Sequence, residues 1–358
     1  MTHPGITPLE AILHRRIAAE GPMSIAEYMA MCLLHPEHGY YTTRDPLGRG
    51  GDFTTAPEIS QMFGEMLGLA LAQCWLDQGQ PSSFVLAELG AGRGTLMTDA
   101  TRAMASVPGL LEAAQLHLVE ASPALKTAQA QALAALSPTF HDSVETLPEA
   151  PLFLVANEFF DALPIRQFLR SGDGWSERVI GVSDGALAFG LTDPAPVAAL
   201  EHRSGDTVEG DLVETCAPAT GIIAEIGRRI AGHGGAALVI DYGSSRSLGD
   251  TFQAVRRHEK VSPLEAPGEA DLTAHVDFGA LAAAAPCEAT DDVPQGVFLE
   301  RLGITARAHA LAARLSGGAL DSHVAAHRRL THPQEMGSLF RTLGLFPAGT
   351  PVPPGLAE

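Results

Sequence analysis

The chain has 358 residues, of which 46% are hydrophobic, and 42 acidic residues outnumber 23 basic ones to give a formal net charge of −19. This length exceeds one minimal domain and falls short of three, so we expect one nucleotide-type core with additions. The acidic balance argues against nucleic acid as a partner. No apolar run approaches the roughly 20 residues that cross a bilayer, so no membrane span is expected.

The first residues and the cysteines bear on the compartment. Residues 1–20 mix Arg15 and Arg16 with Glu10 and Glu20, which is typical of neither a transit peptide nor a secretory signal. The cysteines form no C-x-x-C pair, which predicts free thiols in a reducing compartment. They are Cys32, Cys74, Cys216 and Cys287. We therefore predict a cytoplasmic, bacterial protein.

The N-terminal part is predicted to be helical. Residues 9–19 and 24–34 have the apolar spacing of amphipathic helices, and Ser24 and Glu27 have the capping-box spacing at the start of the second. We expect residues 1–80 to form a helical extension that acts as a lid on the rest of the protein.

A turn-rich stretch covers residues 35–51, and a further helix start follows it. Thr55 and Glu58 again have the capping-box spacing, and Pro57 suits a first helical turn. The apolar stripe that follows predicts one helix running to about residue 77.

From residue 84 the pattern alternates between strand and helix. Four continuous apolar runs are predicted strands, namely residues 84–89, 116–120, 152–156 and 236–241. Such runs, separated by helical segments, predict an α/β fold whose parallel sheet is covered on both faces.

Short alternating runs with glycine turns interrupt this pattern and predict an antiparallel insert, followed by a helix near residues 221–231. We therefore expect a core from residues 81–164 and 232–358 with helical additions, and an inserted substrate subdomain at residues 165–231.

The segment after the first strand indicates the ligand. Gly90, Gly92 and Gly94 precede a helix, and glycine there lets the backbone approach a ligand closely. A dinucleotide-binding fold needs its third glycine at the position of Thr95, one residue later than it occurs here. Glu88 is poorly placed to face a pyrophosphate but can accept hydrogen bonds from a cationic, amino-acid-bearing nucleoside. The pattern resembles the first motif of class I S-adenosylmethionine (SAM) methyltransferases.

Glu120 ends the second strand and is predicted to accept hydrogen bonds from both ribose hydroxyls, because ligands bind at the carboxyl ends of strands in open α/β sheets. The alternative is a solvated strand end. A second group is expected to fold over the cofactor site, with a plain helix start as its alternative. Its members are Asp52, Phe53, Thr55, Pro57 and Glu58.

Asn157, Glu158 and Asp161 follow the third strand and leave the sheet at the same edge. Two acids and an amide beside aromatic residues suit a cationic or amide-bearing acceptor, and Asn157 also lies where it can reach the cofactor. Helix capping by Asn157 and Asp161 is the alternative. The segment 241–243 ends another strand and is interpreted as a strand-to-turn exit.

No metal site is expected, because a zinc site needs convergent ligands and the cysteines form no pair. A serine hydrolase would need G-x-S-x-G at a strand-to-helix turn, whereas the match at residues 181–185 falls at a turn of the predicted antiparallel insert.

Several segments together resemble the MidA-like methyltransferase family, in the same order, over nearly the whole chain. They are residues 51–64, 88–95, 157–164, 240–243, 271–278 and 295–299. The resemblance implies a class I methyltransferase fold with a Rossmann-like sheet, a SAM cofactor and protein arginine as the acceptor. Because the family includes the mitochondrial complex I assembly factor that methylates an arginine, it also implies a respiratory-complex subunit as a candidate partner.

The implied chemistry suits the acids. A guanidinium has a pKa above ~12 and stays protonated, and carboxylates can hold it in bidentate fashion. Glu158 and Asp161, with Asn157, are therefore the candidate catalytic residues. Two alternatives stay open, a SAM-binding assembly or scaffold protein without turnover and a small-molecule methyltransferase.

Overall fold

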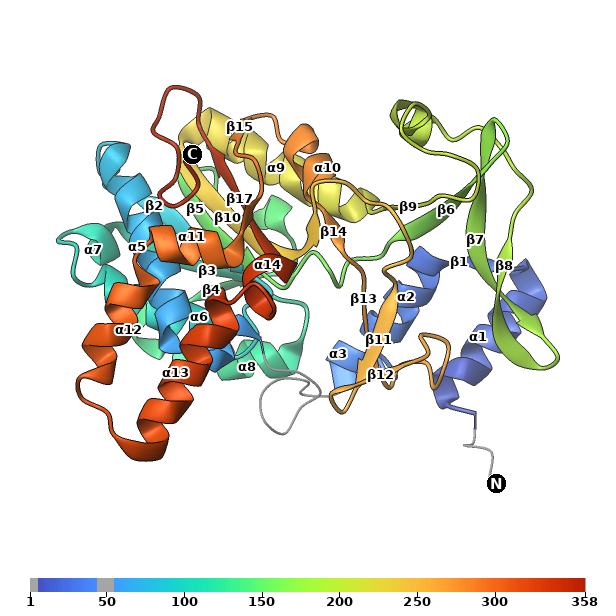
Figure 1. The fold of residues 1–358 in the computed structure, drawn as a ribbon, viewed down its shortest axis with the longest axis horizontal. Helices are drawn as coiled ribbons and strands as arrows, with labels where there is room; N and C mark the ends of the chain where they lie inside the picture. The colour runs from blue at the N-terminus through green and yellow to red at the C-terminus, as the bar shows by residue number, and fades with distance from the viewer. Residues whose placement is uncertain (1–5, 44–54, 358) are drawn as a thin grey trace.

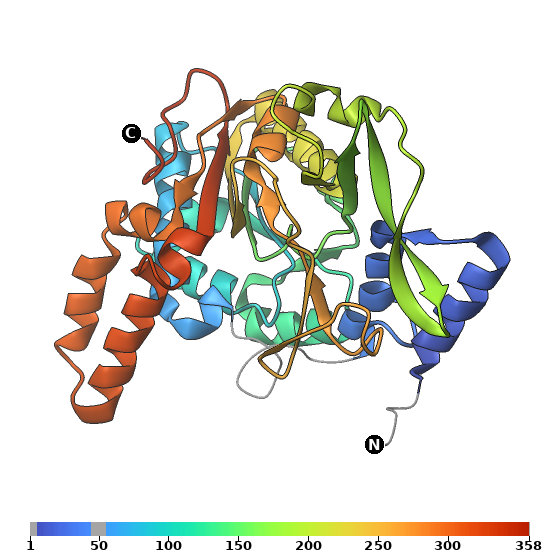
Figure 2. The same ribbon diagram turned by 45° about the vertical axis from the view of Figure 1, so that its right-hand side comes forward.

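The computed structural model describes residues 6–43 and 55–357. A larger lobe is built on a mostly parallel sheet, and a smaller lobe contains helices and antiparallel strands (Figures 1 and 2). The predicted α/β class is confirmed, with a Rossmann-like sheet at its centre.

The central sheet forms from the continuous apolar runs of the sequence, which are buried on both faces. Its main strands are β2 (Phe84–Leu89), β3 (Ala114–Val119), β4 (Thr139–His141), β5 (Leu152–Asn157), β10 (Gly235–Ser244) and β17 (Phe340–Phe346). Strands β2 to β10 of this set are parallel, and β17 is antiparallel to β10. The order is β15-β17-β10-β5-β2-β3-β4, so the chain reverses its direction of travel across the sheet between β2 and β5. A topological switch point of this kind is where ligands bind.

Three short strands complete this sheet, namely β14 (Val276–Asp277), β15 (Glu288–Ala289) and β16 (Val293–Pro294).

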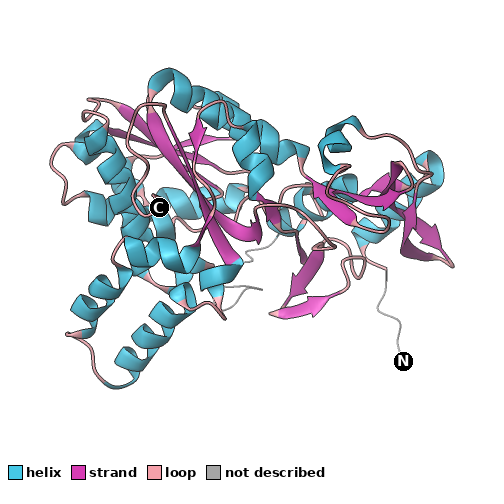
Figure 3. Ribbon diagram, turned by 45° about the horizontal axis from the view of Figure 1, so that its top comes forward, coloured by secondary structure: helices cyan, strands magenta, loops and turns pink. Residues whose placement is uncertain are grey.

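Helices cover both faces of the sheet (Figure 3). Apolar side chains of α5 (Gln61–Asp77) and α6 (Thr95–Met104) pack on one face, and those of α9 (Ala217–His233) and α10 (Phe278–Ala284) on the other. Helix α9, expected in the insert, therefore lies on the core sheet. Further helices of the larger lobe are α7 (Leu110–Ala113), α8 (Pro123–Ala132), α11 (Gln295–Arg301), α12 (Ile304–Ala312), α13 (Gly317–Thr331) and α14 (Met336–Leu339).

Helices α12 and α13 form a hairpin that projects from the larger lobe (Figure 1). Its contact with the core includes a buried charge on α5. Glu65 accepts hydrogen bonds from Arg307 at 2.7 and 2.9 Å and from Arg102 at 3.0 Å. Both arginines satisfy the Glu65 carboxylate, which would be costly to bury alone.

The smaller lobe joins the N-terminal helices to the insert. Its strands are β1 (Met23–Ser24), β6 (Arg166–Ser171), β7 (Gly174–Ser183), β8 (Ala186–Leu191) and β9 (Leu212–Thr215), paired antiparallel in the order β1-β7-β6-β9 with β8 on β7. Helices α1 (Pro8–Glu20) and α2 (Ile25–Leu34) share an apolar cluster with this sheet.

A three-stranded antiparallel sheet also belongs to the smaller lobe, although its residues fall in the range expected for the core. Its strands are β11 (Gln253–Arg256), β12 (Glu259–Val261) and β13 (Asp271–Thr273). Apolar side chains of β11 and β13 join the same cluster as α1 and α2.

The starts of the N-terminal helices agree only in part with the capping patterns predicted from the sequence. The capping box of Ser24 and Glu27 is present. The single helix predicted to run to about residue 77 is wrong, because extended Ser60 separates α4 (Ala56–Ile59) from α5 and caps α5 by accepting from the Met62 N–H at 3.2 Å. The capping box predicted at Thr55 is also wrong, because no backbone N–H of α4 donates to the Thr55 side chain.

Candidate functional site

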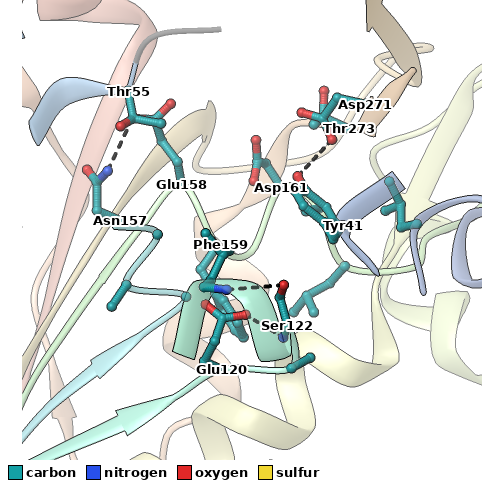
Figure 4. A pocket seen from close by; sticks show the side chains of 18 of the residues that line it. Tyr41, Thr55, Glu120, Ser122, Asn157, Glu158, Phe159, Asp161, Asp271 and Thr273 are labelled. Carbon is teal, nitrogen blue, oxygen red and sulfur yellow. Dashed lines mark hydrogen bonds between the residues drawn. The ribbon is translucent and has the colours of Figure 1, made fainter. Parts of the chain in front are cut away.

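A cavity of about 800 Å³ opens at the carboxyl edge of the central sheet, at the switch point between β2 and β5. Loops after β2, β3 and β5 form one wall, and α3 (Tyr40–Thr43) and β13 contribute another. Figure 4 shows side chains from both walls around it. The cavity has room for a nucleoside and an acceptor side chain, since ligand pockets are typically about 300–1,000 Å³.

The glycine loop forms the wall after β2. Gly90, Gly92 and Gly94 have φ values of 64°, 54° and 81°, in the left-handed region that glycine occupies without strain. A Cβ at Gly90 would lie 2.9 Å from the Phe159 ring. Gly94 precedes α6, and Thr95 and Leu96 in the first turn of that helix line the cavity.

Glu88 lies beneath this loop and is 3% exposed, with no hydrogen-bond partner for Oε2. Burial raises the pKa of Glu88 to about 8, and the neighbouring Glu120 contributes. A buried, unsatisfied carboxylate oxygen in a cavity calls for a donor from a ligand. The ammonium group of SAM's methionine part would supply one, so these residues fit the predicted cofactor.

Glu120 lies at the end of β3, with its carboxylate held in place by the protein. Oε1 accepts from the Ser122 N–H at 2.8 Å, and Oε2 accepts from Gln129 Nε2 at 3.0 Å. Gln129 also donates to the Gly92 carbonyl at 2.8 Å, which ties the glycine loop to Glu120. Burial raises the pKa of Glu120.

Thr55, Pro57 and Glu58 line the cavity as well. The Thr95 hydroxyl donates to Glu58 at 2.6 Å, which fixes α4 against the start of α6. Asp52 and Phe53, predicted for the same site, lie outside the residues that the structure describes.

Glu158 follows β5 with φ of 51°, a conformation that is uncommon for a residue with a side chain. Its Oε1 accepts from the Ala56 N–H at 3.0 Å and from Asn157 Nδ2 at 3.1 Å. Burial raises the pKa of Glu158 to about 7. Asn157 is itself 7% exposed, and its Oδ1 has no partner.

Asp161 is buried and lines the same cavity. Burial raises its pKa to about 6, and a hydrogen bond from the Tyr242 hydroxyl opposes this shift. The capping alternative is excluded for Asn157 and Asp161, because the fully described chain between β5 and β6 contains no helix.

Asp241 was expected at the end of a strand, as a strand-to-turn exit, but β10 continues past it to Ser244 and the Asp241 side chain makes specific contacts. Its Oδ2 accepts from the N–H groups of Phe159, Phe160 and Asp161 at 3.2, 3.0 and 3.2 Å. Fully buried Asp241 therefore holds the turn that carries Glu158 and Asp161. The Asp241 pKa is raised well above its usual value by burial, then by Asp161 and Glu158.

Four further cavity residues received no role from the sequence. The Tyr41 hydroxyl donates to Asp271 at 2.7 Å, and Thr273 and Tyr242 lie beside them. In the sequence, Asp271, Thr273 and Tyr242 were noted only as parts of segments that resemble the family. Tyr41 was noted only as part of the turn-rich stretch.

Within the described ranges, no three His, Cys, Asp or Glu side chains are grouped as metal ligands. Electrostatically the cavity is a set of buried carboxyls around a glycine loop. Such a site favours cationic ligands with N–H donors, because each would relieve the cost of burying these acids.

A family of S-adenosyl-L-methionine-dependent methyltransferases, Methyltransf_28, matches residues 66–294. Protein arginine methyltransferase NDUFAF7 of Homo sapiens is 36% identical and aligns with 96% of this chain and 84% of its own length. The Danio rerio protein of that name is also 36% identical, covering 92% and 84%.

A crystal structure shares the fold over the full length. This protein from Burkholderia thailandensis, bound to S-adenosyl-homocysteine, is 28% identical with a TM-score of 0.81, and the match covers 100% of this chain and 96% of that chain. Its ligand is the product form of the cofactor predicted here.

The curated relatives correct one prediction. They are mitochondrial by name, which contradicts the predicted bacterial, cytoplasmic location. That prediction rested on two absences, namely of a targeting pattern in residues 1–20 and of a C-x-x-C pair. Neither absence identifies a compartment. Among residues 6–43 and 55–357, no helix combines the length and apolarity needed to span a bilayer.

Proposed function

The chain belongs to this family of SAM-dependent methyltransferases, and we propose that it transfers a methyl group to a guanidinium nitrogen of an arginine in a protein substrate. The observation that carries the arginine assignment is the pair Glu158 and Asp161, whose carboxyls line the same cavity as the glycine loop. The names of the relatives support the same acceptor.

The proposed cofactor residues divide by the part of the ligand that they face. Glu88 and the loop glycines Gly90, Gly92 and Gly94 bind the methionine part, and Glu120 binds the ribose. Asn157, which lines the same cavity, contributes its unpartnered Oδ1. Thr55, Pro57 and Glu58, with Asp52 and Phe53 from outside the described residues, complete the proposed set.

When bound, SAM supplies the methyl group as an electrophilic sulfonium. Glu158 and Asp161 bind the guanidinium through charge-assisted hydrogen bonds and hold one nitrogen toward the methyl carbon. As that nitrogen forms its new bond to carbon, the carbon–sulfur bond breaks and both electrons go to sulfur. The nitrogen loses a proton, which the Glu158 carboxylate takes. With a pKa near 7, Glu158 suits this transfer at neutral pH.

Tritiated SAM tests the proposal in a lysate from cells that lack the protein. We expect wild-type protein to label a polypeptide in which mass spectrometry finds methylarginine. Glu158→Gln and Asp161→Asn should reduce labelling roughly ten- to hundred-fold while S-adenosylhomocysteine affinity stays within a few-fold, because each removes one charge-assisted contact.

The matched control is Asp193→Asn, which removes a charge from an exposed residue of the smaller lobe and should label as wild type does. Methyllysine in the labelled band would contradict arginine as the acceptor. Full activity of both cavity variants would place the acceptor elsewhere.

We propose further that the substrate is a subunit of a respiratory complex, as the family resemblance implies. The labelled band should then be recovered with the purified complex or its assembly intermediates. A substrate that never enters a respiratory complex would contradict this part of the proposal alone.

A further inference from the structure

The cavity is bordered by an exposed leucine on each lobe. Leu34 ends α2 in the smaller lobe, and Leu339 ends α14 in the larger lobe. Both side chains line the cavity, yet they are 48% and 49% exposed. Exposed apolar side chains that border a pocket, unlike isolated ones elsewhere on a surface, are typical of a binding site. They offer contact area to a polypeptide that passes over the cavity.

The smaller lobe also places an exposed cation at the cavity. Lys260 lies on β12 and lines the cavity. It is exposed, and it makes no hydrogen bond or ion pair with any residue that the structure describes. Burial lowers the pKa of His275, another cavity residue, and the charge of Lys260 lowers it further. Lys260 is therefore at once accessible to solvent and close to the interior of the cavity.

The larger lobe has a matching cation, Arg329, in the last turn of α13. This helix packs beside α4, which carries the cavity residue Glu58. Burial raises the pKa of Glu158, and the charge of Arg329 opposes that shift, so the guanidinium lies near the cavity. Neighbouring Arg328 pairs with Glu335 at 2.9 Å, whereas exposed Arg329 has no hydrogen bond or ion pair among the described residues.

The charges around the cavity thus form two zones. Its interior is lined by buried carboxyls, and an exposed cation stands beside it on each lobe, on β12 and on α13 (Figure 1). On a chain with a formal net charge of −19, segments rich in arginine or lysine would be attracted broadly. The two cations oppose that attraction at the cavity and favour acidic groups instead. A ligand that complements both zones has a central cation with an acid on either side.

We propose that Lys260 and Arg329 select protein substrates in which acidic residues flank the target arginine. Leu34 and Leu339 contact apolar side chains of the same segment. This inference rests on the proposed function, because it takes the arginine in the cavity as given. The carboxylate of the cofactor is the other anion that could meet Arg329, and the test below distinguishes it from a substrate acid.

Three blocked heptapeptides test this selection, with the full chain and bound S-adenosylhomocysteine. Each has a central arginine between two leucines, and the next residue on both sides is aspartate, asparagine or lysine. Wild-type protein should bind the aspartate peptide roughly five-fold more tightly than the asparagine peptide, since exposed ion pairs are individually modest. The lysine peptide should bind most weakly. Fluorescence anisotropy measures the affinities, and a salt concentration of about 1 M should reduce the differences.

Lys260→Gln combined with Arg329→Gln should bring the aspartate and asparagine peptides close together, while the double variant and each single variant keep wild-type S-adenosylhomocysteine affinity. Lys260→Glu combined with Arg329→Glu should reverse the order, so that the lysine peptide binds most tightly. Both positions are exposed, so these variants should fold. Arg314→Gln is the matched control: it removes an exposed arginine from the α12–α13 connection, at the projecting end of the hairpin, and should keep the wild-type preference.

The outcomes separate the two proposals. Wild-type protein that binds none of the peptides, or binds equally when citrulline replaces the central arginine, overturns the arginine proposal and this inference with it. Arginine-dependent binding without a preference for aspartate, or a preference that survives the double glutamine variant, overturns only the inference. Weaker S-adenosylhomocysteine binding in Arg329→Gln would assign Arg329 to the carboxylate of the cofactor and overturns the inference as well.

Discussion

Single carboxyl groups dominate the chemistry of the cavity. Burial raises the pKa of Glu88 to about 8, of Glu158 to about 7 and of Asp161 to about 6. Such pKa shifts cluster at functional sites. In a low-dielectric cavity that binds a cation, the acids are buried without a counter-charge until the ligand binds, and their pKa values are raised.

This leads to a pH dependence for methyl transfer. Protonated Glu158 and Asp161 lose their attraction for a guanidinium, so kcat/KM should rise as the pH increases through about 6 to 7. A pH–rate profile from pH 5 to 8.5 measures it, with S-adenosylhomocysteine affinity at each pH as the control for cofactor binding. A flat profile across this range would show that neither acid must be ionised.

For single residues, the sequence allowed us to predict which side chains at strand ends would lie close together. It did not allow us to predict contacts between residues that are far apart in the chain. Glu88, Glu120 and Glu158 line one cavity, as expected of residues near the carboxyl ends of parallel strands, which meet at one edge. The contact of Gln129 with Glu120 depends on how α8 docks on the loop, and that of Tyr41 with Asp271 on how α3 packs beside β13 in the smaller lobe. Neither follows from local spacing.

Among the elements, the glycine loop joins the sheet to the cofactor site. Gly92 has φ of 54°, and its carbonyl accepts from Gln129, which also holds Glu120. We expect Gly92→Val to reduce SAM affinity by more than ten-fold, since a β-branched residue strains this conformation by on the order of 1–3 kcal/mol and shifts the loop.

Calorimetry with SAM measures the loss, and a thermal melt checks that Gly92→Val still folds. Gly185→Val is a control at another left-handed glycine, in the exposed β7–β8 turn, where a Cβ meets nothing within 4 Å. It should cost stability but keep SAM affinity. Unchanged affinity in folded Gly92→Val would remove the loop from the site.

The elements themselves were largely predictable where a hydrophobic period is strong. The strand predicted at residues 84–89 coincides with β2, and that at 152–156 differs from β5 by one residue. The break at Ser60 was missed because the apolar stripe continues through it, while its φ and ψ of −161° and 139° are extended. Docking of α4 against Glu158 and Thr95 accounts for that break, and such contacts are tertiary.

On the scale of the whole molecule, the two lobes meet at the cavity and both contribute to it. The larger lobe provides the loops after β2, β3 and β5, and the smaller provides α3 and β13. Sequence periodicity could not assign residues 253–273 to the smaller lobe, because three short strands carry little pattern and their partners lie near the N-terminus. The cavity therefore depends on the docking of segments from both ends of the chain.

This cavity should make the stability of the whole molecule depend on pH. Because folding raises the pKa values of Glu88, Glu158, Asp161 and Asp241, the folded state binds more protons than the unfolded state above pH ~4. The free energy of unfolding contributed by these groups is therefore highest at low pH and falls as the pH rises through about 5 to 8. The melting temperature without ligand should drop by several degrees between pH 6 and 8.5, which differential scanning calorimetry measures.

Bound S-adenosylhomocysteine should offset part of that loss, because its ammonium group pairs with ionised Glu88 and lowers the Glu88 pKa. The difference in melting temperature between ligand-bound and free protein should thus widen from pH 6 to 8. Glu88→Gln is the matched variant: it keeps the size of the side chain and removes the charge, so the difference should no longer grow with pH. A wild-type difference that stays constant across this range would show that Glu88 does not meet the ligand's ammonium group, and the cationic part of the cofactor would then lie elsewhere in the cavity.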